Sequence, residues 1–365
     1  MTEVRRLPLH ADHARLGAKF MQFAGWEVPL QYTTIVEEHQ TVRQKVGIFD
    51  VSHMGKFVIK GEGAFDFLET VLSNGLKKIG PGRAIYSLLL NDKGGVVDDV
   101  IVYEFDRNYF FMIVNAATSE KDFRWLNLHR NQGVELIDES PKKTILAVQG
   151  PQSERLLTKL FDVDFGDLKP FHFRTIKASG TDIFIGATGY TGERGFEIVN
   201  SREKTAEIFQ RILEIGKEFD LRPVGFGARD TLRLEAAYLL YGQDMDDVTS
   251  PLEAGLEWVC DFSKDFIGRN ALLKQKREGL TKKLVGFEVI GNGVARHGYE
   301  IIGGGVKMGE VTSGTFSPTL HKSIGLAYVP MELASLGSEC EIAIRDKHVQ
   351  VRVTKTPFYN RNKIE

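Results

Sequence analysis

The chain has 365 residues, with 47 basic and 49 acidic side chains and a net charge of −2. This length predicts two or three domains, and the balanced charge argues against the basic surface typical of a nucleic-acid-binding protein. No stretch approaches the ~18 apolar residues of a membrane span, and the N-terminal segment lacks the apolar core of a secretory signal. We therefore expect a cytoplasmic protein with no nucleic-acid or membrane partner.

The first half of the chain mixes helices and strands. Helices are predicted over residues 33–46, 64–72 and 119–130, and strands over 56–59, 84–90, 96–105, 109–114 and 134–137. The sequence Asn-Asp-Lys-Gly-Gly at 91–95 predicts a hairpin between two of these strands. The order strand, helix, three strands, helix, strand predicts a ferredoxin-like unit with one extra strand.

The polar segment 138–143 contains a proline and predicts a boundary. Beyond it, strands are predicted over 144–148, 171–178 and 181–187, a helix opening at Pro151, and helices over 202–217 and 225–236. A second boundary is expected near 277–283. Short strands separated by glycine turns follow it, which predicts a small all-β barrel or jelly roll. The fold class is therefore α+β. We expect three domains: 1–50 plus 144–280, 51–143 and 281–365.

The segment Gly-Tyr-Thr-Gly-Glu-Arg-Gly-Phe-Glu at 189–197 is the most informative part of the sequence. Its glycines permit positive φ and close approach of the backbone to a ligand. Phe196, Ile198 and Val199 predict a short buried strand with Glu197 inside it. An unpaired buried charge is costly, so Glu197 has either a functional role or a salt bridge that stabilises a tight turn.

Asp98 and Asp99 lie in the middle of a predicted strand whose two faces are both apolar. Because side chains alternate along a strand, the two carboxylates face opposite sides. Either one is compatible with a functional role, with an ion pair to an arginine or with capping of the nearby glycine turn. Periodicity alone does not distinguish them.

Arg229 and Arg233 are four residues apart and share a face of the predicted helix 225–236. Paired arginines suit bidentate recognition of a carboxylate, and the alternative is a salt bridge with Asp230 or Glu235. Phosphate-loop, dinucleotide-binding, nucleophile-elbow and HExxH zinc motifs are absent. The two cysteines, Cys260 and Cys340, form no cluster with histidines. We therefore expect neither a disulfide framework nor a metal site.

Several segments together resemble one family, the T-protein (aminomethyltransferase) of the glycine cleavage system. The resemblance runs in family order over essentially the whole chain. It is carried by FAGWEVP, DVSHMGK, NDKGGVVDDVIVY, VNAA, GYTGERGFE, GARDTLRLEA and TSGTFSPTL.

This resemblance implies a three-domain fold around a central funnel that holds folate. It implies transfer of the methylene group from an aminomethyl-lipoyl arm of H-protein to tetrahydrofolate. The products are 5,10-methylenetetrahydrofolate, ammonia and dihydrolipoyl H-protein. The family members are mostly monomers, and the reaction belongs to glycine catabolism and one-carbon metabolism. No metal is implied.

The resemblance also assigns roles to individual residues. Asp99 matches the catalytic aspartate, which stabilises an iminium-like centre and positions the folate. Glu197 and Arg229 match the folate-pocket glutamate and arginine, and a carboxylate suits the adjacent N3–H and 2-amino donors of a pterin. The residues implied to surround the folate are Met54, Tyr103, Asn115 and Tyr238, with Arg361 as a C-terminal arginine near the pocket.

Proteins with related folds have other functions, and these are the alternatives for this chain. One relative is a folate-binding factor for iron–sulfur enzyme maturation that carries a cysteine in a KGCYTGQE-like motif, whereas this chain has Ala187 and Thr188 before Gly189. Another relative is fused to a flavin domain, for which this chain is too short. A non-catalytic folate-binding module is a third alternative, disfavoured by the intact Asp98–Asp99 pair.

Overall fold

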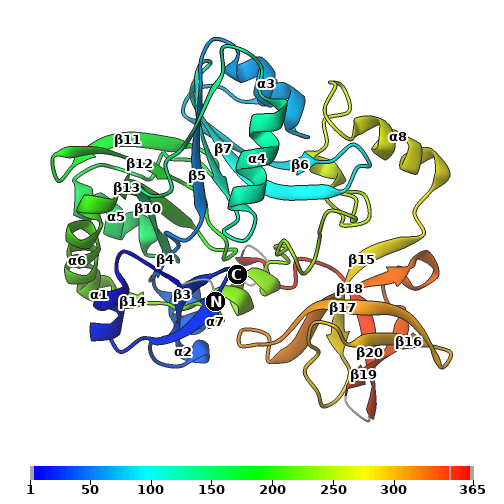
Figure 1. Ribbon diagram of the computed structural model, residues 1–365. Coiled ribbons are helices and arrows are strands. Elements are labelled where there is room, and N and C mark those ends of the chain that lie inside the picture. Colours follow the sequence, from blue (N-terminus) through cyan, green and yellow to red (C-terminus); the bar gives the residue numbers. More distant parts are fainter. Residues whose placement is uncertain (1–3, 345–346, 362–365) are drawn as a thin grey trace. The chain divides into compact units, whose positions relative to one another are not determined.

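The computed structural model (Figure 1) describes residues 4–344 and 347–361. The chain divides into two compact units. The first unit contains residues 1–71, 75–87 and 100–229. The second contains residues 72–74, 88–99 and 230–365. Strands β6 (Arg83–Leu90) and β7 (Val96–Asp106) and helix α7 (Phe226–Glu235) continue from one unit into the other. The predicted domain boundaries at 50, 143 and 280 stay predictions.

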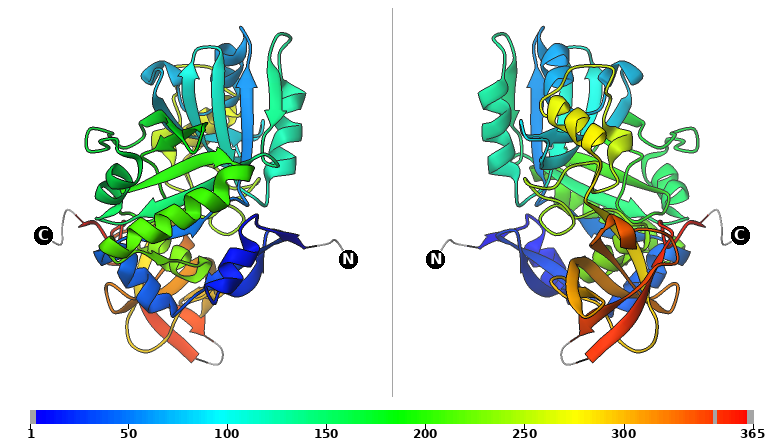
Figure 2. Two further views of the ribbon diagram at one scale, coloured as in Figure 1. Left: turned by 90° about the vertical axis from the view of Figure 1, so that its left-hand side faces the viewer. Right: turned by 90° about the vertical axis from the view of Figure 1, so that its right-hand side faces the viewer.

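A six-stranded sheet forms the centre of the first unit, in the order β11-β12-β13-β10-β4-β14. Its strands are β4 (Gly47–Asp50), β10 (Lys143–Gln149), β11 (Phe173–Ala178), β12 (Thr181–Gly186), β13 (Gly195–Ser201) and β14 (Arg222–Pro223). Helices α5 (Ser153–Phe161) and α6 (Thr205–Gly216) pack against it (Figure 2). Their leucines, isoleucines and Phe209 share one buried cluster with the sheet. Burial of these apolar side chains stabilises the sheet that carries Glu197.

The N-terminal segment adds elements that the sequence patterns did not predict. Strands β1 (Arg5–Arg6), β2 (Lys19–Phe23) and β3 (Trp26–Gln31) form a small sheet, and α1 (His10–Arg15) lies between β1 and β2 in the chain. Helix α2 (Ile35–Gln44) confirms the helix predicted over 33–46. Its N-cap is Thr34, whose hydroxyl accepts a hydrogen bond from the Glu37 N–H at 3.2 Å, as expected for a threonine in that position.

The predicted strand–helix series of residues 56–137 is confirmed. It consists of β5 (Gly55–Lys60), α3 (Ala64–Val71), β6, β7, β8 (Tyr109–Val114), α4 (Ser119–His129) and β9 (Glu135–Asp138). The strands form a sheet in the order β6-β7-β8-β5-β9. Three strands separate the two helices in the chain, and the last of them, β8, pairs antiparallel with β5, with Gly55 opposite Val114.

The second unit contains a closed barrel, which confirms the all-β prediction for the C-terminal part. Its strands follow the order β15-β18-β17-β16-β19-β20. They are β15 (Lys282–Val289), β16 (Glu300–Gly303), β17 (Val306–Ser317), β18 (Lys322–Pro330), β19 (Glu339–Ile344) and β20 (Lys347–Thr354). Valine, isoleucine and Phe287 side chains fill its interior. Helix α8 (Arg269–Glu278) precedes the barrel and was not predicted.

Candidate functional site

Glu197 lies within β13, flanked by β10 and β12. Its Cα partners are Ala147 and Gly186 on those strands, and its side chain is 9% exposed. The Thr188 hydroxyl donates to Oε2 at 2.5 Å and the Tyr103 hydroxyl donates to the same oxygen at 3.4 Å. In the described part of the chain, the partners of Glu197 are therefore hydroxyl groups and not a cation.

The turn before Glu197 is shaped by the buried side chain of Gln149. Its amide nitrogen donates to the Thr188 carbonyl at 3.2 Å, and its oxygen accepts from the Thr191 hydroxyl at 3.0 Å. A Cβ at Gly189 or Gly195 would come within 2.0 or 2.3 Å of Gln149 atoms. These two glycines therefore make room for a protein side chain, and not only for a ligand.

Two arginines from other parts of the first unit, Arg43 and Arg229, contact the same turn. Arg43 donates to the Thr191 carbonyl at 2.7 Å and to the Glu193 carboxylate at 3.0 Å, and both side chains of the ion pair are buried. The Arg229 guanidinium lies 4.7 Å from the ring centroid of Tyr190, a distance typical of a cation–π contact. The turn is thus fixed on two sides.

The Asp50–Lys56 loop, which joins β4 to β5, is held at its start by a buried network. Asp50 accepts from the Ser52 N–H at 2.9 Å and bonds His13 Nε2 at 3.0 Å. His13 Nδ1 in turn bonds the Tyr32 hydroxyl at 2.9 Å. Burial acts to raise the pKa of the Asp50 carboxyl, but the hydrogen bond and charge of His13, together with the hydrogen bonds from Ser52, lower that pKa overall. Asp50 therefore stays ionised and fixes the loop.

Lys56 holds the other end of the loop from inside the protein. Its side chain is fully buried, and Nζ donates to the carbonyls of Ser52 and Met54, each at 2.8 Å. Burial lowers the pKa of Lys56 to about 8. The backbone of Met54, one of the predicted site residues, is thereby positioned by a side chain two residues later.

The buried Lys56 gives a testable pH dependence of stability. Below pH 8 the folded protein carries a buried ammonium group. Between pH 8 and the unfolded pKa of 10.5 the unfolded chain binds more protons, so stability rises with pH. We expect the difference in unfolding free energy between wild type and Lys56→Met to grow in favour of wild type across this window. The slope is at most about 1.4 kcal/mol per pH unit. Urea unfolding at several pH values measures it, and parallel curves for the two proteins would contradict the assignment.

His53 precedes Met54 and is also buried, at 4% exposure. Its ring centroid lies 6.0 Å from that of Phe23 and 5.6 Å from that of Phe226. Burial, followed by the charge of Arg229, lowers the pKa of His53 to about 3. The imidazole is therefore neutral at physiological pH and adds no charge to the loop.

The two aspartates of β7 follow a tightly specified hairpin. The Asn91 side chain accepts from the N–H groups of Lys93 and Gly95 at 2.9 and 3.1 Å, and its amide donates to the Asp247 carbonyl at 2.8 Å. A Cβ at Gly95 would meet that carbonyl oxygen at 1.9 Å, so only glycine fits there. Within β7, Asp98 is fully buried and Asp99 is partly exposed, which makes Asp99 the accessible carboxylate.

Arg233 of helix α7 is committed to structure within the second unit. It is 1% exposed. It donates to Asp230 at 2.8 Å, to Asp244 at 2.7 Å, to the Ser313 hydroxyl at 2.9 Å and to the Tyr238 carbonyl at 3.0 Å. The salt-bridge alternative therefore holds for Arg233, with Asp244 as a partner that sequence spacing did not indicate.

The end of α7 also anchors the C-terminal tail. The Glu235 carboxylate accepts from the Ser317 hydroxyl and, at 3.1 Å, from the Thr319 N–H. The Glu235 carbonyl accepts from the Tyr359 N–H at 2.8 Å. Tyr238 follows Glu235 by three residues and Arg361 follows Tyr359 by two, so one helix end fixes both segments. Tyr238 is 42% exposed.

Comparisons with known proteins agree over the whole chain. Residues 9–264 match the GCVT N-terminal domain and residues 282–360 match the glycine cleavage T-protein C-terminal barrel domain. The chain belongs to the glycine cleavage T-protein family.

Individual relatives of this T-protein family member match it over almost the full length of both chains. An aminomethyltransferase of Caldanaerobacter subterraneus subsp. tengcongensis is 45% identical over 365 residues, covering 99% of this chain and 98% of the relative. One of Thermosynechococcus vestitus is 48% identical over 359 residues, covering 98% and 96%. The crystal structure of glycine cleavage system aminomethyltransferase T from Bartonella henselae has a TM-score of 0.92 at 31% identity, covering 98% of each chain. The chain is thus an aminomethyltransferase of the glycine cleavage system.

The structure brings some of the predicted site residues of the T-protein together. Tyr103 directly contacts Glu197. Met54 directly precedes β5 and Asn115 directly follows β8. Because Gly55 pairs with Val114, the two residues lie at the same end of these neighbouring strands. Arg229 lies in the first unit with them, whereas Asp99, Tyr238 and Arg361 belong to the second.

Two contributing residues were missed by sequence reasoning. The sequence places Thr188 only opposite the cysteine motif of a relative, and Lys56 only in the predicted strand 56–59 and in a family segment. Thr188 bonds residues 9 and 85 positions away, and Lys56 bonds carbonyls of the irregular loop before β5, so no side-chain periodicity marks either residue. Thr188 does lie directly before a glycine-rich turn, where a polar side chain is close to the backbone of the next strand.

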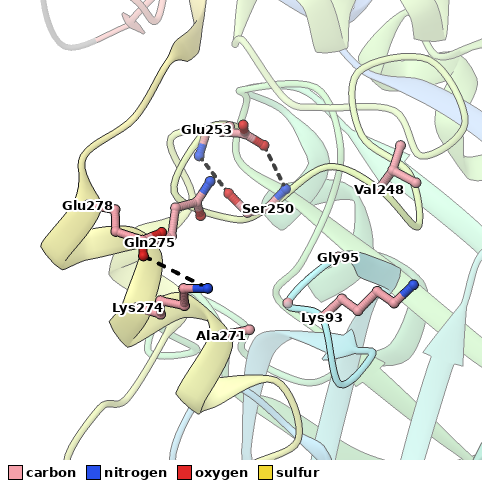
Figure 3. A pocket seen from close by; sticks show the side chains of 10 residues that line it. Lys93, Gly95, Val248, Ser250, Glu253, Ala271, Lys274, Gln275 and Glu278 are labelled. Atoms are coloured by element: carbon pink, nitrogen blue, oxygen red, sulfur yellow. Dashed lines mark hydrogen bonds and ion pairs between the residues drawn. The ribbon is translucent and has the colours of Figure 1, made fainter.

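The second unit has a surface pocket whose lining contains none of the predicted site residues. It is formed by the hairpin residues Lys93–Gly95, the loop carrying Val248, Ser250 and Glu253, and helix α8 (Figure 3). Ser250 and Glu253 exchange backbone–side-chain hydrogen bonds at 3.1 and 3.2 Å, the pattern of a capping box.

Over residues 4–344 and 347–361, no three His, Cys, Asp or Glu side chains are grouped so as to hold a metal ion. Within the same ranges, no helix combines the length and apolar character needed to cross a membrane.

Proposed function

We propose that the chain transfers the methylene group of aminomethyl-lipoyl H-protein to tetrahydrofolate. The C–S and C–N bonds of the aminomethyl group break, and bonds from its carbon to N5 and N10 of the folate form. The two protons lost from N5 and N10 go to sulfur and ammonia. The products are dihydrolipoyl H-protein, ammonia and 5,10-methylenetetrahydrofolate. No oxidant, metal or enzyme nucleophile takes part.

The observation that carries this proposal is the match of both family domains over the full chain. The donor set supports it, because Glu197 is a nearly buried carboxylate that the sheet, Thr188 and Tyr103 hold in place. A fixed carboxylate of this kind suits the adjacent N–H donors of a pterin ring. We assign Arg229, Met54, Asn115, Tyr238 and Arg361 to folate binding on the resemblance.

Asp99 is the catalytic carboxylate in this proposal. Loss of ammonia or thiolate leaves iminium-like positive charge on the methylene carbon, and a fixed anion beside that carbon stabilises the transition state. The same group accepts or holds the proton of the attacking folate nitrogen. The partial exposure of Asp99, in contrast to the complete burial of Asp98, supports this assignment. Action as a cytoplasmic monomer stays a prediction.

The test is to mix the purified protein with aminomethyl-loaded lipoylated H-protein and tetrahydrofolate. We expect equimolar release of methylenetetrahydrofolate and ammonia. The matched control omits folate, and a second uses H-protein without its lipoyl group. Folate binding without either product would contradict aminomethyl transfer and favour the non-catalytic module or the maturation factor.

A further inference from the structure

Three polar groups meet inside an apolar part of the first unit: the Tyr103 hydroxyl, the Thr188 hydroxyl and the Glu197 carboxylate. Tyr103 is fully buried, Thr188 is 6% exposed and Glu197 is 9% exposed. The rings of Phe173 and Phe184 lie 5.5 and 5.2 Å from the Tyr103 ring, centroid to centroid. The two buried hydroxyls find hydrogen-bond partners within this set, as expected because an unsatisfied buried hydroxyl is costly.

The protons available to this set fix the direction of its hydrogen bonds. Each hydroxyl has one proton, whereas an ionised carboxylate has none. Thr188 lies 2.5 Å from Oε2 of Glu197, so its proton goes to that oxygen. Tyr103 then donates to Thr188 at 2.8 Å or to the same carboxylate oxygen at 3.4 Å. Burial and the charge of Glu197 raise the pKa of Tyr103 well above its usual value, so it remains a donor.

Both hydroxyl groups lie beside Oε2 of the carboxylate, Thr188 at 2.5 Å and Tyr103 at 3.4 Å. In the described ranges of the chain, no donor reaches Oε1 of Glu197. An anionic oxygen with free lone pairs binds hydrogen-bond donors and repels acceptors. The arrangement therefore selects for a ligand group that presents N–H donors.

We propose that Thr188 and Tyr103 are positioning residues that hold Oε2 of Glu197 and orient Oε1 toward the donor edge of the folate pterin. This inference rests on the proposed function. It gives Tyr103 a role through Glu197 and not through contact with folate, and it adds Thr188 to the site. Gly186 is part of the same arrangement, because a Cβ there would lie 2.8 Å from the Tyr103 ring.

The test measures tetrahydrofolate binding to Thr188→Val and Thr188→Ser. Valine keeps the shape of threonine without its hydroxyl group, whereas serine keeps the hydroxyl. We expect Thr188→Val to raise the Kd for tetrahydrofolate about tenfold, with kcat at saturating folate nearly unchanged. Thr188→Ser should restore most of the affinity. Melting curves establish that each variant is folded.

A double-mutant cycle separates positioning from a general structural effect. In a Glu197→Ala background, Thr188→Val should leave the Kd unchanged, because the group that it orients is gone. Equal losses in both backgrounds, or an unchanged Kd in Thr188→Val alone, would overturn the inference. If wild type binds no tetrahydrofolate, the proposed function itself fails. If wild type binds folate and only Glu197→Ala weakens binding, the function stands and only the role of Thr188 fails.

Discussion

Replacing Asp99 by asparagine should lower kcat by about 10²- to 10⁴-fold while leaving the Kd for tetrahydrofolate nearly unchanged. The amide keeps the size and shape of the carboxylate, so folate still fits. It lacks the negative charge that stabilises the iminium-like carbon and the basicity needed to take a proton. Single-turnover formation of methylenetetrahydrofolate measures the chemical step, and equilibrium titration measures binding. An equal loss in both quantities would make Asp99 a binding residue.

Asp98→Asn is the matched control, since it changes the same group one residue earlier on β7. Asp98 is fully buried and Asp99 is partly exposed. The two side chains leave the strand on opposite faces. We therefore expect Asp98→Asn to affect stability more than turnover. If Asp98→Asn proves the less active variant once folding has been verified, the assignment of the catalytic aspartate has the wrong register.

The elements that carry the strongest candidates could be predicted from sequence because their signals are local. The strand around Glu197 appears as β13, and the glycine hairpin before Asp98 appears as predicted between β6 and β7. Turn residues determine the hairpin, and a short apolar run directly after a glycine-rich turn determines β13. The barrel was predictable for the same reason, because glycine turns mark the ends of its strands.

The elements that were missed have weak local signals. Helix α8 has one buried side chain, Leu272, among many charged residues. Strand β3 contains Pro29, which disfavours a strand assignment. Both form because tertiary partners are present, as when Leu272 packs within 2.9 Å of the position that a Cβ on Gly94 would occupy.

The site itself depends on long-range pairing that no spacing reveals. Thr188 meets a tyrosine 85 residues earlier in the chain, and Arg233 meets Ser313, 80 residues later. In both cases the residue type was compatible with several partners, and only the fold selected one. Arg229 and Arg233 are equivalent by helical period, yet their partners differ: Arg229 lies over the Tyr190 ring, whereas Arg233 bonds Asp244.

Glu197→Gln should raise the Kd for tetrahydrofolate by about 10- to 100-fold, because a hydrogen bond to a charged group contributes about 1.5–3 kcal/mol. The amide has one acceptor and one donor end. If its oxygen accepts from Thr188, its NH₂ group faces the pterin donors and repels them. If its nitrogen faces Thr188, the two hydroxyls lose the acceptor that now lies 2.5 and 3.4 Å away. Glu203→Gln removes the same charge from an exposed position and should leave the Kd unchanged. Isothermal titration with tetrahydrofolate measures both variants. Equal affinity of Glu197→Gln and wild type would show that this carboxylate does not bind the pterin.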